Sequence, residues 1–298
     1  MTDALTTIAT AGEVELAGKK VFRMAFGAMH LGDPMIWGPP ADRDHSIRLA
    51  RHAIELGVNH FDTADSYGLG TVENILREAL HPYPEELLIA TKVGQVQPRP
   101  LEWVPIGHPA FLRHQCEMSL RRLGVDRIDL LYLHRADPNV PFEDQVGTMR
   151  ELQEEGKIAH FGLSEVTVDQ IETARSIIEV AAVENIYNLT VRGWNAVVDY
   201  CTRERIPFMP WWPVMNGALA QPGGIVAEIA AQTGSSPTQV ALAWLLARSE
   251  MVCPIPGTSS TAHLEENVAA AALRLTDEQI TALTAAGGSD GEFTGPYI

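Results

Sequence analysis

Four residues that can move protons occur at comparable places in this chain. Asp62, Lys92 and His134 each lie at or near the end of a short apolar run, and Tyr67 lies five residues after Asp62. A carboxyl, a phenol, an amine and an imidazole that meet at one place can transfer a proton to or from a carbonyl oxygen. Taken singly, each residue has a plainer interpretation: the Asp as a helix cap or turn residue, the Tyr as a pocket wall, the His as a satisfied polar group.

The elements that must position these residues alternate between strand and helix. Strand-like runs occur near 20–28, 59–64, 87–93, 128–134, 158–163, 180–187, 206–211 and 252–256. Amphipathic helical runs lie between them, for example Asp44–Leu56, Pro109–Leu123, Phe142–Glu155 and Val168–Ile178. Asp44, Thr167 and Asp277 are candidate helix starts, and Gly57, Gly124, Gly156 and Gly234 are candidate stops. Eight such alternations predict a closed (β/α)8 TIM barrel, in which the C-terminal strand ends gather around one mouth.

Several motifs occur in a fixed order around the four residues. They are Phe61–Gly68 (FDTADSYG), Thr91–Lys92, Leu133–Asp137 (LHRAD), Gly162–Ser164, Ile255–Thr258 and Glu266–Asn267. Together they resemble the aldo-keto reductases, and the resemblance extends from about residue 20 to about residue 285. It implies an α/β barrel with an N-terminal hairpin plug, whose turn Gly18 would supply. Extra outer helices would accommodate the helical runs Ser236–Arg248 and Thr276–Ala285.

The resemblance assigns a role to each of the four residues. Tyr67 would donate the proton to a carbonyl that accepts a hydride, and Lys92 would lower the pKa of the phenol, which is about 10 when unperturbed. Asp62 would hold Lys92 by a charge-assisted hydrogen bond. His134 would hydrogen-bond the carbonyl or relay the proton.

Other chemistries lack their motifs. The sequence contains no HExxH or CxxC ligand pattern, no GxSxG nucleophile elbow and no GxGxxG after a strand. We therefore expect no metal, and a nicotinamide held at the barrel mouth as the source of hydride. The cofactor that the resemblance implies is NADP(H). NAD(H) is the alternative, because Gly257 and His263 stand where many relatives place a Lys or Arg pair against the 2′-phosphate.

The positions that the resemblance assigns to cofactor binding are Gly27, Met29, Asp62, Ser164, Glu165, Glu184, Trp211, Pro213, Val214, Asn216, Gly217, Leu219, Gly257, Thr258, Ser259, His263, Glu266 and Asn267. Trp211 replaces the more usual Tyr that stacks on the nicotinamide. Glu165 and Glu184 replace amides that orient its carboxamide, and an ionised carboxylate can only accept hydrogen bonds.

The substrate is expected to be a small carbonyl compound. Shorter motifs such as Trp37–Pro40 and Gly57–His60 resemble the bacterial pyridoxal reductase branch, which makes pyridoxal the candidate substrate. Trp37, Trp103 and Trp212 are the candidate pocket walls, with Trp103 in a long loop at 95–108. The alternatives are a tailoring reductase of a sugar or secondary metabolite, and a cofactor-bound regulatory subunit with little turnover.

Composition narrows the class of protein further. The 298 residues contain no linker-like segment, so a single domain over 1–298 is expected. A net charge of −16 argues against nucleic acid or an anionic membrane as a partner. Three scattered cysteines, no apolar leader and no membrane-length apolar stretch indicate a cytoplasmic protein. The sequence does not predict an oligomeric state.

Overall fold

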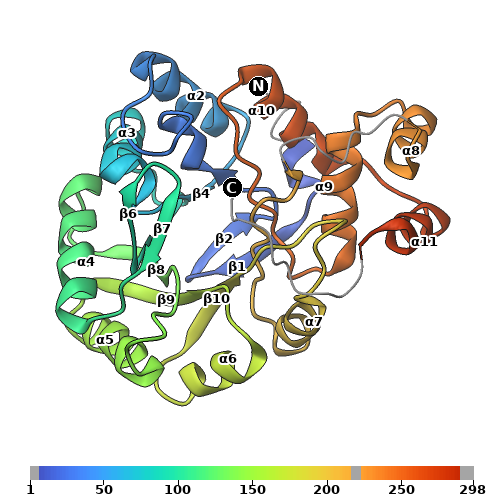
Figure 1. Cartoon of the computed structure of the whole chain (residues 1–298). Helices are drawn as coiled ribbons and strands as arrows, with labels where there is room; N and C mark the ends of the chain where they lie inside the picture. Colours follow the sequence, from blue (N-terminus) through green and yellow to red (C-terminus); the bar gives the residue numbers. More distant parts are fainter. Residues whose placement is uncertain (1–6, 216–222, 289–298) are drawn as a thin grey trace.

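A curved sheet of six parallel strands lies at the centre of the molecule (Figure 1). The computed structural model describes residues 7–215 and 223–288. In sheet order the strands are β10 (Val180–Glu184), β9 (Ile158–Ser164), β8 (Ile128–Leu133), β5 (Leu88–Val93), β4 (His60–Asp62) and β3 (Phe26–Gly27). Every neighbouring pair is parallel, so the C-terminal strand ends share one end of the sheet.

Two irregular segments, one around Phe208 and one around Val252, close the gap between β10 and β3. Val183 of β10 bridges Phe208, Phe208 bridges Val252, and Gly27 of β3 bridges Gly257. The sequence predicts regular strands here, but the structure shows only isolated bridges. The reason is that proline has no backbone N–H to donate to a neighbouring strand. The two segments contain Pro207, Pro210, Pro254 and Pro256. The closed eight-segment barrel confirms the predicted fold class.

Helices surround the barrel (Figure 1). They are α2 (Arg43–Glu55), α3 (Thr71–Leu80), α4 (Pro109–Leu123), α5 (Phe142–Glu154), α6 (Val168–Arg175), α7 (Asn195–Glu204), α8 (Ile225–Thr233), α9 (Pro237–Arg248), α10 (Thr261–Ala269) and α11 (Asp277–Ala286). The outer pair is α8 and α11, which pack on α9 and on each other. The family resemblance places Ser236–Arg248 outside the barrel. This prediction is wrong, because α9 buries every residue from Val240 to Leu246 and is a barrel helix. Across the described ranges, no helix is long and apolar enough to cross a membrane.

Short polar side chains start several helices. The predicted starter Thr167 caps α6 with a full capping box. For α2 and α11 the caps are Asp42 and Thr276, so the predicted Asp44 and Asp277 lie inside the first turn. A carboxylate there still interacts favourably with the N-terminal helix dipole, which is why both positions resemble helix starts in the sequence.

An antiparallel hairpin lies at the N-terminal ends of the strands. Its strands are β1 (Glu13–Leu16) and β2 (Lys19–Phe22), joined at Ala17 and Gly18, which both have positive φ. Lys19 Nζ donates to the carbonyl of Leu87 at 2.6 Å and to Asp129 at 2.9 Å, at the starts of β5 and β8. The hairpin therefore covers this end of the barrel, and the open mouth lies at the other.

A second hairpin extends from the C-terminal end of β5. The sequence predicts a long loop at 95–108, but most of this segment forms β6 (Gln95–Arg99) and β7 (Glu102–Pro105). Figure 1 shows this hairpin beside the mouth of the barrel. It gives Trp103 an ordered position over the site.

Candidate active site

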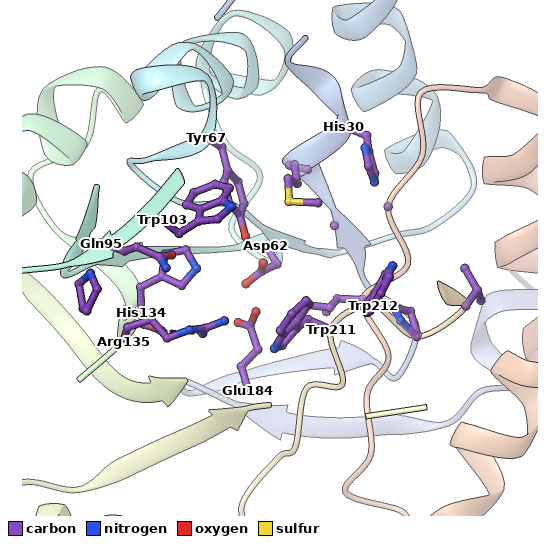
Figure 2. A pocket seen from close by; sticks show the side chains of 18 of the residues that line it. His30, Asp62, Tyr67, Gln95, Trp103, His134, Arg135, Glu184, Trp211 and Trp212 are labelled. Carbon is purple, nitrogen blue, oxygen red and sulfur yellow. Dashed lines mark hydrogen bonds between the residues drawn. The ribbon is translucent and has the colours of Figure 1, made fainter. Parts of the chain in front are cut away.

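A cavity of about 300 Å³ opens at the C-terminal ends of the strands. Its walls contain Gly27, Ala28, Met29, His30, Asp62, Tyr67, Gln95, Trp103, Pro105, His134, Arg135, Ala136, Glu184, Trp211, Trp212, Pro213, Val214, Ile255 and Gly257. Figure 2 shows the side chains of Asp62, Tyr67 and His134 directed into the same space. A mainly apolar cavity with a few convergent polar groups is typical of a small-molecule site.

Lys92 lies under the cavity between two carboxyls. It is fully buried at the C-terminal part of β5 and donates to Asp62 Oδ1 and, at 3.1 Å, to the carbonyl of Thr63. Glu184 Oε2 lies 3.3 Å from its ammonium from the β10 side. Because β4, β5 and β10 all end here, residues far apart in the sequence meet at one ammonium.

The charges of this cluster shift one another's pKa values. Burial lowers the pKa of Lys92, but Asp62 and Glu184 outweigh burial, and the net shift is upward. Burial raises the pKa of Asp62 despite Lys92, and burial together with Asp62 raises the pKa of Glu184 to about 8. Lys92 is therefore a permanent cation at neutral pH.

Tyr67 lies above this cluster at the start of the short helix η2 (Tyr67–Gly70). Lys92 Nζ lies 5.4 Å from the centre of its ring. The sequence predicts a lowered phenol pKa, and Lys92 does act in that direction. Burial outweighs it, however, and the pKa of Tyr67 rises to about 12. The phenol consequently stays protonated and able to donate.

A buried polar network fixes the chain between Asp62 and Tyr67. The Asp65 amide donates to the Lys92 carbonyl at 3.1 Å. Gln115 of α4 donates to the Asp65 carboxyl at 2.5 Å and accepts from the Gly94 amide at 2.8 Å. This network ties Tyr67 to β5 and α4, which limits its movement.

His134 follows β8 and faces the Tyr67 ring edge to face, with centroids 5.9 Å apart. Its amide donates to the Val93 carbonyl at 2.8 Å. Burial, Arg135 and Lys92 hold the pKa of His134 well below its usual value. The imidazole is therefore neutral, with one nitrogen able to donate a hydrogen bond.

Trp211 forms a flat wall on the opposite side of the cavity. Its indole N–H donates to Glu165 Oε1 at 2.7 Å, and the Arg135 guanidinium lies 5.6 Å from its ring centre. Trp212 stacks beside it with centroids 6.4 Å apart and planes at 18°. Both indoles therefore have defined orientations at the cavity wall.

The predicted cofactor residues lie in two regions, at the cavity and at the start of α10. Gly27, Met29, Asp62, Glu184, Trp211, Pro213, Val214 and Gly257 line the cavity. Ser164 is buried and accepts from Arg135 at 2.9 Å, and Glu165 holds Trp211. Thr258, Ser259, His263, Glu266 and Asn267 lie at or in the first turns of α10. The predicted Asn216, Gly217 and Leu219 fall outside the described residues.

Two of the three tryptophans predicted as pocket walls lie in the described lining of the cavity. Trp103 and Trp212 line the cavity, whereas Trp37 is absent from its described lining. The Trp37 amide instead donates to Asp33 at 3.0 Å within its own loop.

Three polar residues of the cavity wall were not predicted from the sequence: Arg135, Gln95 and His30. Arg135 directly follows His134, so its place in the motif was a usable signal. The sequence around Gln95 and His30 contains no signal that marks them as wall residues. In the described part of the chain, no three His, Cys, Asp or Glu side chains are grouped to hold a metal.

The chain is similar to known proteins over most of its length. The profile of the Aldo/keto reductase family matches residues 23–287. A Schizosaccharomyces pombe protein named an uncharacterized oxidoreductase is 47% identical over 280 residues, covering 94% of this chain and 91% of the relative. Pyridoxine 4-dehydrogenase of Escherichia coli is 40% identical over 274 residues, covering 90% and 96%.

A solved structure supports the same assignment. A thermostable aldo-keto reductase, crystallised with the inhibitor epalrestat, superposes with a TM-score of 0.81 at 27% identity, over 92% of this chain and 99% of that one. The chain therefore belongs to the aldo/keto reductase family of oxidoreductases.

Proposed function

We propose that the protein reduces an aldehyde or ketone to the alcohol with NADPH as the hydride donor. The observation that carries this proposal is the pairing of two neutral hydrogen-bond groups, Tyr67 and His134, above a buried Lys92 cation. A carbonyl oxygen placed between the two rings would meet a donor on each side. That arrangement stabilises negative charge that develops on the oxygen.

The bound nicotinamide would supply a hydride to the carbonyl carbon. The carbonyl oxygen would then take the Tyr67 proton. The donor's C–H bond, the carbonyl π bond and the phenol O–H bond break, while a C–H and an O–H bond form in the alcohol. Lys92, whose ammonium lies 5.4 Å from the centre of the Tyr67 ring, would stabilise the resulting phenolate, and Asp62 keeps Lys92 in place. His134 holds the carbonyl oxygen by a hydrogen bond, and the phenolate regains its proton from water afterwards.

The residues present fit a nicotinamide cofactor. The Trp211 face, oriented by Glu165, offers a planar stacking surface next to the proposed carbonyl site. Ser260 caps α10 and leaves exposed Ser259 and His263 at this helix N-terminus, where a phosphate can bind. With no Lys or Arg in 257–263, the preference for NADPH over NADH should be modest.

Pyridoxal is the proposed substrate. The similarity to the Escherichia coli pyridoxine 4-dehydrogenase supports it, as do the indoles of Trp103 and Trp212 on the cavity wall. A planar heteroaromatic aldehyde would stack against such walls with its carbonyl toward Tyr67.

The test compares kcat/KM for pyridoxal with that for nitrobenzaldehyde under NADPH oxidation. A preference for pyridoxal supports this substrate. Turnover of nitrobenzaldehyde without pyridoxal turnover eliminates pyridoxal and leaves a general carbonyl reductase. Absence of turnover with every aldehyde contradicts the enzymatic proposal and favours a regulatory subunit.

A further inference from the structure

The cluster beneath the cavity contains two carboxyls for one ammonium. Asp62, Lys92 and Glu184 have side-chain exposures of 4%, 0% and 3%. Figure 2 shows the Asp62 and Glu184 carboxyls pointing toward each other across the cavity floor. If both were ionised, this group of three buried side chains would hold a net negative charge, which is costly to bury.

The hydrogen bonds of the two carboxyls also argue against both of them being ionised. Asp62 Oδ1 accepts from Lys92, but Asp62 Oδ2 has no hydrogen-bond donor among the described residues, and Glu184 Oε2 has only the ion pair with Lys92 at 3.3 Å. The two carboxyls nevertheless lie beside the same ammonium and point toward each other (Figure 2). A single proton between them would remove the excess charge and give one of these acceptors a donor.

The remaining groups that face Glu184 do not remove the need for that proton. Tyr67 and Tyr132 are neutral phenols whose pKa values burial raises. Arg135 favours the ionised form of Glu184, but it exerts the weakest of the opposing effects. Its guanidinium bonds the His134 carbonyl at 2.8 Å and Ser164 Oγ at 2.9 Å.

We infer that Glu184 is a protonated carboxylic acid at neutral pH that donates to Asp62. The upward shift of the Glu184 pKa to about 8 is consistent with this geometry. Protonation also restores one hydrogen-bond donor to a side chain that, when ionised, can only accept. Glu184 is then a positioning residue that acts through Asp62 and Lys92.

One consequence rests on the proposed function. The oxidised nicotinamide ring is positively charged and the reduced ring is neutral. Loss of the Glu184 proton places a negative charge in the cavity floor, so alkaline pH should favour the oxidised cofactor over the reduced one. The cluster would thereby bias the direction of the reaction with pH.

Infrared difference spectroscopy of the ligand-free protein tests the protonation state directly. Between about pH 6 and about pH 10 the wild type should lose a protonated-carboxyl band with a midpoint near the Glu184 pKa, and Glu184→Gln should lack this band. Asp65→Asn identifies any band from Asp65, whose pKa burial also raises. If wild type and Glu184→Gln have the same protonated-carboxyl absorption at the acid end, the inference is overturned. NMR of labelled glutamate carboxyls in the unmodified protein gives the same decision without a substitution.

Binding measurements test the consequence. Quenching of tryptophan fluorescence gives Kd for NADP+ and NADPH at about pH 6.5 and about pH 9; the preference for NADP+ should rise about tenfold in wild type and stay flat in Glu184→Gln. An equal rise in Glu184→Gln contradicts the coupling. Failure of both cofactors to bind would instead contradict the proposed function, while the infrared titration still decides the protonation state.

Discussion

The Trp103 ring meets the Tyr67 ring edge to face, with centroids 6.4 Å apart and planes at 84°. Trp103 lies on β7, in the hairpin that follows Lys92 along the chain, so one excursion from β5 both walls the cavity and restrains the proposed proton donor. The contact therefore links the wall of the cavity to the orientation of the phenol.

Replacing Trp103 should therefore affect binding and turnover together. Trp103→Ala should raise KM for an aromatic aldehyde by up to about tenfold, the worth of one aromatic contact. It should also lower kcat, because Tyr67 loses a neighbour. Trp37→Ala is the comparison, since Trp37 is not in the described lining. Equal effects of the two substitutions on steady-state kinetics would contradict the placement of the substrate beside Trp103.

Gly162 makes room for Tyr132 inside the barrel. A Cβ at this position would lie 2.4 Å from ring atoms of Tyr132, which packs beside Lys92. Gly162→Ala should cost about 1–3 kcal/mol by overpacking. Gly147→Ala in α5 is the matched control, because nothing lies within 4 Å of its added methyl; it should stabilise the helix by about 1 kcal/mol. Urea unfolding of both variants measures the difference, and an unchanged or raised stability of Gly162→Ala would refute the packing argument.

Much of this fold was predictable because its signals are local. Apolar runs and glycine stops mark most strands and helices, and the motif residues lie at strand ends. The closing segments were overpredicted as strands because Pro207 and Pro254 interrupt their ladders. The net pKa shift of Tyr67 has the opposite sign to the prediction, since the sequence shows Lys92 but not the burial that outweighs it. The meeting of Glu184 with Asp62 depends on barrel closure and has no local signal.

Two buried neutral histidines should make the protein sensitive to acid. Burial and Lys92 lower the pKa of His60 to about 3, and the pKa of His134 also lies well below its ordinary value. The unfolded chain binds protons at these positions near pH 6.5 and the folded chain does not. Their stabilising contribution is therefore present above about pH 6.5 and is lost as pH falls toward the folded values, at about 1.4 kcal/mol per pH unit for each histidine.

Denaturant unfolding at about pH 7 and about pH 5 measures this loss. His60→Leu removes one of the two titrating rings and should lose less stability between these conditions than the wild type. An identical loss in wild type and variant would show that His60 does not titrate as its burial implies.

The start of α10 should determine the strength of the NADP preference. His263 is exposed in the first turn of this helix, and His263→Arg adds a bidentate phosphate ligand. The ratio of NADPH to NADH affinity should increase about tenfold. His114→Arg, which adds the same charge on α4, should leave the ratio unchanged. Tighter binding of NADH than NADPH in the unmodified protein would contradict the choice of NADP(H).

The most direct test of the proposed mechanism is Tyr67→Phe. This substitution keeps the ring beside Trp103 and His134 and removes only the O–H group. Turnover of an aldehyde should fall by about 10² to 10⁴, the usual contribution of a general acid, while Kd for NADPH stays within about twofold. Reduction by the Phe variant at a rate within a few-fold of wild type would show that Tyr67 is not the proton donor.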